Sequence, residues 1–509
     1  MNDRSASTAP DGDANDACDH RAHVRSAPDG GSSALQRRLG LALLVAVTVL
    51  GAWVGFDRAT AAFGNSDEGL NSSVWAMCSR SLRDDPTGSA LGGRRIDGVD
   101  YATHPPLMCS ATAALEAVAG EHEWVTRAPA WLSTFSLVPL LYVLLRRMRL
   151  DAVPAAAGTA VAVGSPMVLT YGSMLDTPVL AVPFAVMVAI ALTSELAGSP
   201  RRAWPVGLVA LSCAAAGLVA WQAGVFAFAC AASTLRWGRN PRRAVAYAVG
   251  ALVGLTSSVG WGVWTYGSLD ELRDKFSTRT TGSYSLGESL SFQVDWLLIL
   301  LGVGVFALVA GAVALTDREW RPIMAPALAT FALWGLVFHS GAGGHQYWNY
   351  FVVLPLALGG GWGLARLGSR VDSRDVLPFT GDVAVAALAA LAVLLAAAGP
   401  SQAAKLIDRG HHTGELLREA ELGPGDELAV VGADVRVTSI VVYYTGRSPI
   451  PLDRGRLESL AADDPNTPVL IALPCPPDSA LCRDLPEAQR RRDTLTTAGE
   501  IVATLPGEG

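Results

Sequence analysis

The sequence predicts an all-α polytopic membrane protein that carries a small α/β domain at its C-terminal end. Half of the 509 residues are hydrophobic and only 17% are charged, which is fewer charges than soluble domains of this length carry. The apolar residues are gathered into runs near the ~20 residues that a helix needs to cross a bilayer. Residues 401–509 differ, because short apolar runs alternate there with helix-like stretches, as in a small α/β domain.

The N-terminal segment is polar. Residues 1–36 are rich in Asp, Ser and Arg, which predicts a disordered tail on the cytoplasmic side. The first apolar run follows without a convincing small-residue cleavage site, so we expect an uncleaved anchor rather than a signal peptide. Lysine is scarce while Ala, Gly and Arg abound, a composition that favours a bacterial origin.

Eleven apolar runs are candidate membrane spans, and they define a transmembrane domain over residues 37–400. Two of them contain Gly-x-x-x-Gly spacings, Gly250 with Gly254 and Gly359 with Gly363, which favour close helix packing. The candidate spans are 39–56, 126–145, 152–171, 177–195, 204–219, 221–235, 243–265, 294–315, 322–339, 349–367 and 380–398.

Basic residues in the short loops predict the orientation. Arginines precede the first span and then cluster in every second loop, as in RRMR (146–149) and RWGRNPRR (236–243). Such loops favour the cytoplasmic side. We therefore expect the N-terminus inside and, with an odd number of spans, the C-terminus outside. The outer face then holds the first loop (57–125), the turn 171–178, a polar loop (267–292) and the turn 341–350.

Four cysteines fall on the expected outer side, which is oxidising in bacteria. Cys78 and Cys109 form one possible disulfide pair, and Cys475 and Cys482 form another. Spacing alone establishes neither pair.

The first outer loop places two adjacent acids at the membrane surface. Asp67 and Glu68 begin DEGLNSSVWAMCSRSL (67–82), whose apolar residues recur at helical spacing and predict an amphipathic helix along the membrane. Carboxylates at a helix N-terminus are favoured by the helix dipole, so simple capping is one explanation of the pair. A catalytic pair is the other.

The same loop contains a His–Pro–Pro turn. Residues 107–118 predict an apolar helix that ends at Gly120, and prolines suit its first turn. His104 stands just before that helix, and Pro105 with Pro106 makes the turn rigid, which suits holding His104 in place. A helix-initiating turn with an incidental His is the alternative.

Other polar side chains stand at the outer ends of spans. Arg127 begins the second span, where an anion such as lipid phosphate and simple snorkelling are alternative explanations. Asp176 precedes Pro178 in a tight turn, and turn formation also explains it. His345 and Tyr347 lie in a third outer segment, where Tyr347 also fits an interfacial aromatic belt.

Two cations of the polar loop, Lys275 and Arg279, are either solvated charges or part of a phosphate-facing patch. Together these acids, histidines and cations gather on one face of one membrane. Transfer from a lipid-phosphate donor needs such a set, because a base must activate the acceptor hydroxyl and cations must stabilise the departing phosphate.

The order of these motifs resembles glycosyltransferase family 39 and its relatives, the protein O-mannosyltransferases and lipid A aminoarabinose transferases of the GT-C superfamily. The resemblance rests on the first span, the following DE, the HPPL motif and an Arg at the start of the second span. It extends to GSMLDTPVLA (172–181), GHQYWNYFVVLPLALGGG (344–361) and VVYYTGRSPI (441–450), and it covers most of residues 39–450.

The resemblance implies a GT-C-like fold and a role for several residues. Asp67 would be the general base on the acceptor hydroxyl, and Glu68 would shape the same site. Arg127 would contact the polyprenyl phosphate, and the His–Pro–Pro turn would brace the pocket near the donor. The remaining substrate-binding candidates are Asp176, Lys275, Arg279, His345 and Tyr347.

The implied reaction is an inverting transfer from a polyprenyl-phosphate sugar to an envelope glycan, lipid or protein. His104 stands where many aminoarabinose transferases carry Lys, so the acceptor is left open. A transporter or flippase of lipid-linked substrates is the main alternative, and a non-catalytic scaffold is a third. The chain has no P-loop, which argues against a nucleotide-driven pump. Its ionisable residues gather at the outer ends of spans rather than at the midplane, which argues against a transporter.

The expected setting is the cytoplasmic membrane of a bacterium, with the bilayer and a lipid-linked sugar as partners and no nucleic acid. No cofactor is predicted. Asp67, Glu68 and His104 would be the ligands of a divalent metal, but their spacing fits no standard metal motif, so no metal site is predicted.

Overall fold

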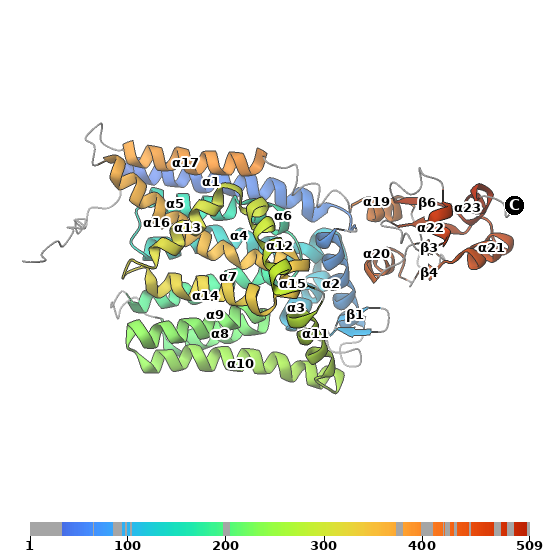
Figure 1. Cartoon of the computed structure of the whole chain (residues 1–509), viewed down its shortest axis with the longest axis horizontal. Coiled ribbons are helices and arrows are strands. Elements are labelled where there is room, and N and C mark those ends of the chain that lie inside the picture. Colours follow the sequence, from blue (N-terminus) through green and yellow to red (C-terminus); the bar gives the residue numbers. More distant parts are fainter. Residues whose placement is uncertain are drawn as a thin grey trace, which may run out of the picture.

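A bundle of apolar helices makes up most of the chain, and a smaller α/β unit extends from one end of it (Figure 1). The predicted tail lies outside the described residues, except that the first helix already begins at Ala34. The computed structural model describes residues 33–505 except 65, 85–93, 97–98, 102–103, 197–203, 283, 373–379, 399–410, 421, 423–427, 432–434, 447–448, 473–479 and 486–492.

Every predicted span coincides with apolar helix. Seven helical segments are long and apolar enough to cross a membrane, and the other four predicted spans fall on the shorter helices α5, α8, α9 and α14. The chain is a multi-pass membrane protein, and the number of crossings remains a prediction. The bundle consists of α1 (Ala34–Thr60), α4 (Glu123–Arg147), α5 (Ala152–Val163), α6 (Pro166–Tyr171), α7 (Thr177–Leu196), α8 (Val206–Val219), α9 (Trp221–Ser233), the π-helix η2 (Thr234–Gly238), α10 (Pro241–Tyr266), α12 (Leu286–Leu301), the 3-10 helix η3 (Gly302–Gly304), α13 (Val305–Ala314), α14 (Arg321–Val337), α16 (Val353–Asp372) and α17 (Thr380–Ala398).

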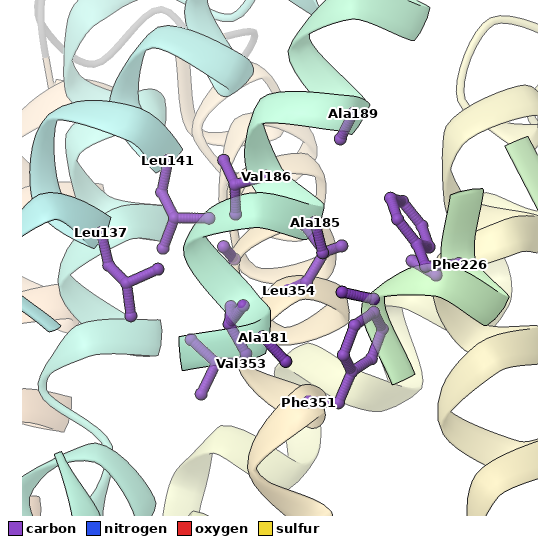
Figure 2. Close-up of a cluster of buried hydrophobic side chains, with 14 of the residues drawn as sticks. Leu137, Leu141, Ala181, Ala185, Val186, Ala189, Phe226, Phe351, Val353 and Leu354 are labelled. Carbon is purple, nitrogen blue, oxygen red and sulfur yellow. The ribbon is translucent and has the colours of Figure 1, made fainter. Parts of the chain in front are cut away.

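Helix α7 forms the centre of the bundle. Of its most apolar stretch, Thr177–Ser194, 89% is buried inside the protein. Figure 2 shows α7 surrounded by side chains of α4, α9 and the segment that leads into α16. A helix enclosed on all sides is held firmly, so its N-terminal end, which begins at Thr177, is a rigid support for side chains at that end of the bundle. The labelled side chains are Leu137, Leu141, Ala181, Ala185, Val186, Ala189, Phe226, Phe351, Val353 and Leu354.

Glycines allow the helix backbones to approach closely, as the Gly-x-x-x-Gly spacings predicted. A side chain at Gly250 or Gly254 would overlap a backbone carbonyl oxygen of α8, and one at Gly359 would overlap a carbonyl oxygen of α13. Packing of this kind stabilises helix pairs in lipid, where no hydrophobic effect drives them together. The predicted packing role of these glycines is therefore confirmed.

The polar elements collect at the end of the bundle that faces the α/β unit (Figure 1). The predicted polar loop 267–292, which connects two predicted spans, is largely helical, because it contains α11 and the start of α12. Charged residues outnumber apolar ones in α11, and only Leu272 and Phe276, at helical spacing, mark it as a helix. The elements are α2 (Asp67–Asp84), the antiparallel hairpin β1 (Arg94–Ile96) and β2 (Val99–Tyr101), α3 (Leu107–Ala119), α11 (Asp270–Thr281), α15 (His339–Gly344) and the 3-10 helix η4 (Gln346–Val352).

Helix α2 was predicted to lie along the membrane surface, and much of it is covered by other parts of the protein. The helix itself is confirmed, but most of its residues are buried, including the polar Asn71, Ser72 and Ser73. It packs against α3 on one side and against α20 (Val435–Thr445) of the α/β unit on another. Both apolar and polar side chains of α2 therefore serve in packing against the rest of the protein.

The C-terminal unit is a small α/β domain, as predicted. Its sheet has the order β4-β3-β5-β6, with β3 parallel to β4 and β5 and with β6 antiparallel to β5. One face of the sheet shares its hydrophobic cluster with Phe63 and Ala76 of the transmembrane part. The unit comprises α19 (His411–Glu419), β3 (Ala429–Val431), α20, β4 (Ile450–Pro451), α21 (Arg454–Asp463), β5 (Pro468–Ile471), α22 (Ala480–Asp484), β6 (Thr494–Thr497) and α23 (Ala498–Thr504).

A disulfide between Cys78 and Cys109 joins α2 to α3, with the two Cα atoms 6.0 Å apart. This predicted pair is confirmed. Cys482 is also disulfide-bonded, whereas its predicted partner Cys475 lies outside the described residues. The Cys78–Cys109 bond fixes the helix that begins at Asp67 relative to the helix that follows His104.

Removing this disulfide should destabilise the protein. The disulfide joins residues 31 positions apart in the sequence. By its effect on the entropy of the unfolded chain, such a cross-link contributes about 3–4 kcal/mol to the free energy of unfolding. We expect the double variant Cys78→Ala with Cys109→Ala to unfold at a clearly lower temperature in detergent, as followed by tryptophan fluorescence. Cys213→Ala is the matched control, because Cys213 is a buried cysteine that is not part of a disulfide. Equal midpoints for the two variants would contradict the prediction.

Candidate functional site

The carboxylate of Asp67 is held at the start of α2 by a neighbouring segment. Its Oδ2 accepts a hydrogen bond from Nε2 of Gln346 at 3.0 Å, and the residue is half-buried. Gln346 belongs to η4 and was not among the sequence candidates, although it lies between His345 and Tyr347. The carboxylate is thus oriented by a buried amide, while the residue remains partly exposed.

Capping of α2 is performed by another residue. The hydroxyl of Ser66 accepts a hydrogen bond from the backbone N–H of Gly69 at 3.2 Å. A tight turn precedes the helix, and a side chain at Gly69 would overlap the backbone of Gly64. Since Ser66 satisfies the first turn, capping does not explain why Asp67 is an acid.

Glu68 and Arg127 form a buried ion pair. Nε of Arg127 lies 2.5 Å from one carboxylate oxygen of Glu68, and the side chains are 0% and 1% exposed. The guanidinium also donates to the carbonyl oxygens of Ala59 and Ala61 and lies 4.5 Å from the ring centre of Phe63. The anion that Arg127 meets is therefore Glu68 and not a lipid phosphate. The pair supports the turn that carries Asp67, which agrees with the expectation that Glu68 shapes the site, and it engages the Arg127 guanidinium that was expected to contact polyprenyl phosphate.

The His–Pro–Pro turn meets the start of α7. Nδ1 of His104 lies 3.5 Å from the hydroxyl of Thr177, and its ring packs 5.4 Å from that of Trp75 on α2. Asp176 is 2% exposed and accepts a hydrogen bond from the backbone N–H of Thr177 at 2.6 Å. Asp176 therefore shapes the helix start that positions Thr177 and His104. Of the two prolines, Pro105 is buried and Pro106 precedes the first residue of α3.

A pocket of about 290 Å³ opens beside His104. Its wall is mainly apolar, with both aromatic and aliphatic side chains, and Lys275 and Arg279 of α11 stand in it as cations. The guanidinium of Arg279 lies 5.2 Å from the ring centre of Trp348, a cation–π contact that fixes its position. The lining residues are His104, Thr177, Pro178, Ala220, Trp221, Gln222, Val225, Leu255, Val259, Leu272, Lys275, Phe276, Arg279, Trp334, Phe338 and Trp348.

His345 and Tyr347 stand behind this pocket rather than in its wall. The ring of His345 stacks on Trp348 at 5.9 Å, and Tyr347 is buried against Tyr171 with ring centres 6.0 Å apart. Both residues therefore support η4, the segment that supplies Gln346 to Asp67 and Trp348 to the pocket. Trp348 was not among the candidate site residues, although it directly follows Tyr347 and lines the pocket.

The α/β unit is joined to the Asp67 turn by a tyrosine. The hydroxyl of Tyr444 accepts the backbone N–H of Phe63 at 2.9 Å and donates to Glu123 at 3.0 Å. Burial, and next the charge of Glu123, raise the pKa of Tyr444 well above its ordinary value, so the hydroxyl keeps its proton. The VVYYTGRSPI motif thus contributes to the support of the site.

A second contact between the two parts comes from α2. Arg80 donates to the backbone carbonyl oxygens of Val442 and Tyr443 at 3.1 and 2.9 Å and forms an ion pair with Glu121. Its guanidinium also lies 5.5 Å from the ring centre of Tyr443. The α/β unit therefore rests on α2 through both hydrogen bonds and ring contacts.

The described residues do not form a metal site. Across these segments of the chain, no group of three His, Cys, Asp or Glu side chains converges as metal ligands do. Of the three residues considered above as ligands, Glu68 is already committed to Arg127.

Comparison with solved structures finds this fold in membrane proteins. ArnT from Cupriavidus metallidurans bound to undecaprenyl phosphate matches with a TM-score of 0.61 and 15% identity, over 92% of this chain and 99% of that one. Its apo state matches with a TM-score of 0.58 over the same shares. The archaeal oligosaccharyltransferase AglB from Archaeoglobus fulgidus, in complex with an inhibitory peptide and a dolichol-phosphate, matches with a TM-score of 0.50 and 11% identity, over 86% and 70%. No protein-family model and no curated protein matches the sequence.

Proposed function

We propose that this chain, which has the GT-C fold of membrane glycosyltransferases, transfers a sugar from a polyprenyl-phosphate donor to an acceptor hydroxyl. One observation carries the proposal. The short helix η4 supplies both Gln346, which holds the carboxylate of Asp67, and Trp348, which lines the pocket with Lys275 and Arg279. A general base and a cation-bearing pocket are thereby built on one segment.

In the proposed reaction, Asp67 takes the proton of the acceptor hydroxyl as its oxygen attacks the anomeric carbon. The bond between that carbon and the phosphate oxygen breaks on the opposite side, so the configuration at the anomeric carbon inverts. The electron pair leaves with the polyprenyl phosphate, and Lys275 and Arg279 stabilise the charge that develops on it. The proton ends on the Asp67 carboxylate, and all atoms are accounted for without a cofactor.

The surroundings of the pocket favour this chemistry over transport. The pocket lies where α11, the start of α7 and the start of α9 meet, at the end of the bundle that carries α2 and α3 (Figure 1). A transporter would place its site near the bilayer midplane, between broken helices. Two structures of the same fold hold polyprenyl-type phosphates, which supports a lipid-linked donor here.

We further propose that this end of the bundle faces outward from a bacterial cytoplasmic membrane, with the N-terminus inside. The arginine pattern of the short loops supports this orientation. The acceptor would then be an envelope glycan, lipid or protein. Hexoses and pentoses are both suitable donor sugars.

The test uses the full chain in lipid nanodiscs with a panel of radiolabelled polyprenyl-phosphate hexoses and pentoses and a cell-envelope extract. We expect label to leave one of the lipids only when both protein and extract are present. If no donor loses label, binding of undecaprenyl phosphate is measured next by native mass spectrometry. Absence of both transfer and binding would overturn the proposal.

Replacing a pocket cation should weaken use of the donor. Hydrogen bonds to charged groups contribute about 1.5–3 kcal/mol, so Arg279→Gln should raise the KM for the donor about 10- to 100-fold. Arg273→Gln is the matched control, because Arg273 lies on the same helix, is exposed and is not part of the pocket wall. The prediction fails if both variants show the same donor KM as the native protein.

A further inference from the structure

We infer that Gln222 determines the specificity of the pocket by accepting a hydrogen bond from a hydroxyl or amine of the donor sugar. The inference rests on the proposed function. Gln222 is the second residue of α9, is 2% exposed and lines the pocket. Its Nε2 donates to the backbone carbonyl oxygen of Trp348 at 3.1 Å. Its Oε1 is buried and has no hydrogen-bond partner among the described residues.

An unpartnered oxygen in this place requires an explanation. Leaving a buried acceptor without a partner costs free energy, and native proteins satisfy nearly all such atoms. The bond to Trp348 fixes the amide, so Oε1 does not simply rotate toward another protein donor. A ligand in the pocket is the partner that the geometry leaves open.

The chemistry of Oε1 identifies which part of the donor it meets. A carbonyl oxygen only accepts hydrogen bonds, and an ionised phosphate diester has no hydrogen to give. The phosphate instead suits Lys275 and Arg279, which are cations in the same pocket. The partner of Gln222 is therefore a hydroxyl or an amine, groups that the sugar carries and the polyprenyl chain lacks.

The neighbouring wall suits a sugar in two further ways. The indole N–H of Trp334, a residue of the pocket wall, is also buried and has no hydrogen-bond partner among the described residues. A hydroxyl both donates and accepts hydrogen bonds. The rings of Trp334, Phe338 and Trp348 cluster with centres 4.4–6.4 Å apart, which gives an apolar surface for the C–H face of a sugar ring.

The test compares two ligands on the full chain in nanodiscs. The probes are undecaprenyl phosphate, which lacks a sugar, and undecaprenyl-phosphate hexoses and pentoses, each without acceptor. We expect Gln222→Met, which keeps the volume, to weaken binding of the preferred sugar-bearing lipid about 10- to 100-fold. Binding of undecaprenyl phosphate should stay within about twofold of the native value, by the same measure.

The matched control is Gln293→Met. Gln293 is buried and also donates from Nε2 to a backbone carbonyl oxygen, that of Gly335 at 3.0 Å, but it is not part of the pocket wall. Thermal midpoints of both variants report folding. Equal weakening of both lipids by Gln222→Met, or no weakening of either, would overturn this inference while the proposed function stands. Failure of the native chain to bind any of these lipids would overturn both.

Discussion

Asp67→Asn should lower the turnover number about 10²- to 10⁴-fold, the range that a general base contributes. The amide keeps the size of the carboxylate but does not take the proton of the acceptor hydroxyl. Its contact with Gln346 at η4 is outside the pocket wall. Donor binding should therefore stay near the native value, and the measurement is single-turnover release of labelled sugar together with the donor Kd.

Asp57→Asn is the matched control for this variant. Asp57 lies near the end of α1, ten residues earlier, and is exposed. The substitution Asp57→Asn makes the same change of charge on the same side of the bundle. A general electrostatic effect on turnover would therefore appear in both variants. If Asp67→Asn keeps native turnover, Asp67 is not the base, whatever the control shows.

Arg127→Met should destabilise the protein by about 3–5 kcal/mol, the usual cost of breaking a buried ion pair. The change leaves the carboxylate of Glu68 buried without its cation, and both side chains are at most 1% exposed. It also removes the donors that hold the carbonyl oxygens of Ala59 and Ala61. The free energy of unfolding, measured by denaturant titration in detergent, should fall accordingly.

The double variant Glu68→Met with Arg127→Met distinguishes a structural role of Arg127 from a role in binding the donor phosphate. Replacing both partners by apolar side chains removes the unpaired charge, so a large part of the stability should return. A phosphate-binding Arg127 predicts the opposite pattern, with native stability in the single variant and a raised KM for the donor. That outcome would restore the role that the sequence resemblance implied.

The positions of the membrane-spanning helices along the chain were predictable, because they depend on the composition of long segments. Apolar runs, arginine-rich loops and glycine spacings act over whole helices, and the helices follow them closely, as α10 shows from Pro241 to Tyr266. Helix α11 was missed because its charged residues outnumber its apolar ones. Only the repeat of Leu272, Phe276 and their neighbours marks it as a helix with one face toward a pocket.

The site was predictable as a set of residues but not as a set of contacts. Asp67 and His104 are on the elements that the sequence indicated, whereas Arg279 was placed in a polar loop and lies on the helix α11. Which anion Arg127 meets depends on a turn that brings Glu68 beneath it, 59 residues earlier in the chain. Gln346 and Gln222 are neutral amides in apolar surroundings. A functional role for such residues cannot be inferred from the sequence until their neighbours in the structure are known.

The hydrogen bond between Phe63 and Tyr444 has a consequence for the order in which the protein folds. It joins residues 381 positions apart, so a nascent chain makes the turn that carries Asp67 long before the tyrosine that completes its support exists. Contacts at such separation form late in folding. The turn that carries Asp67 therefore gains its hydrogen bond to Tyr444 only after every later helix has been inserted. Folding of the α/β unit is then the last step in the assembly of the site.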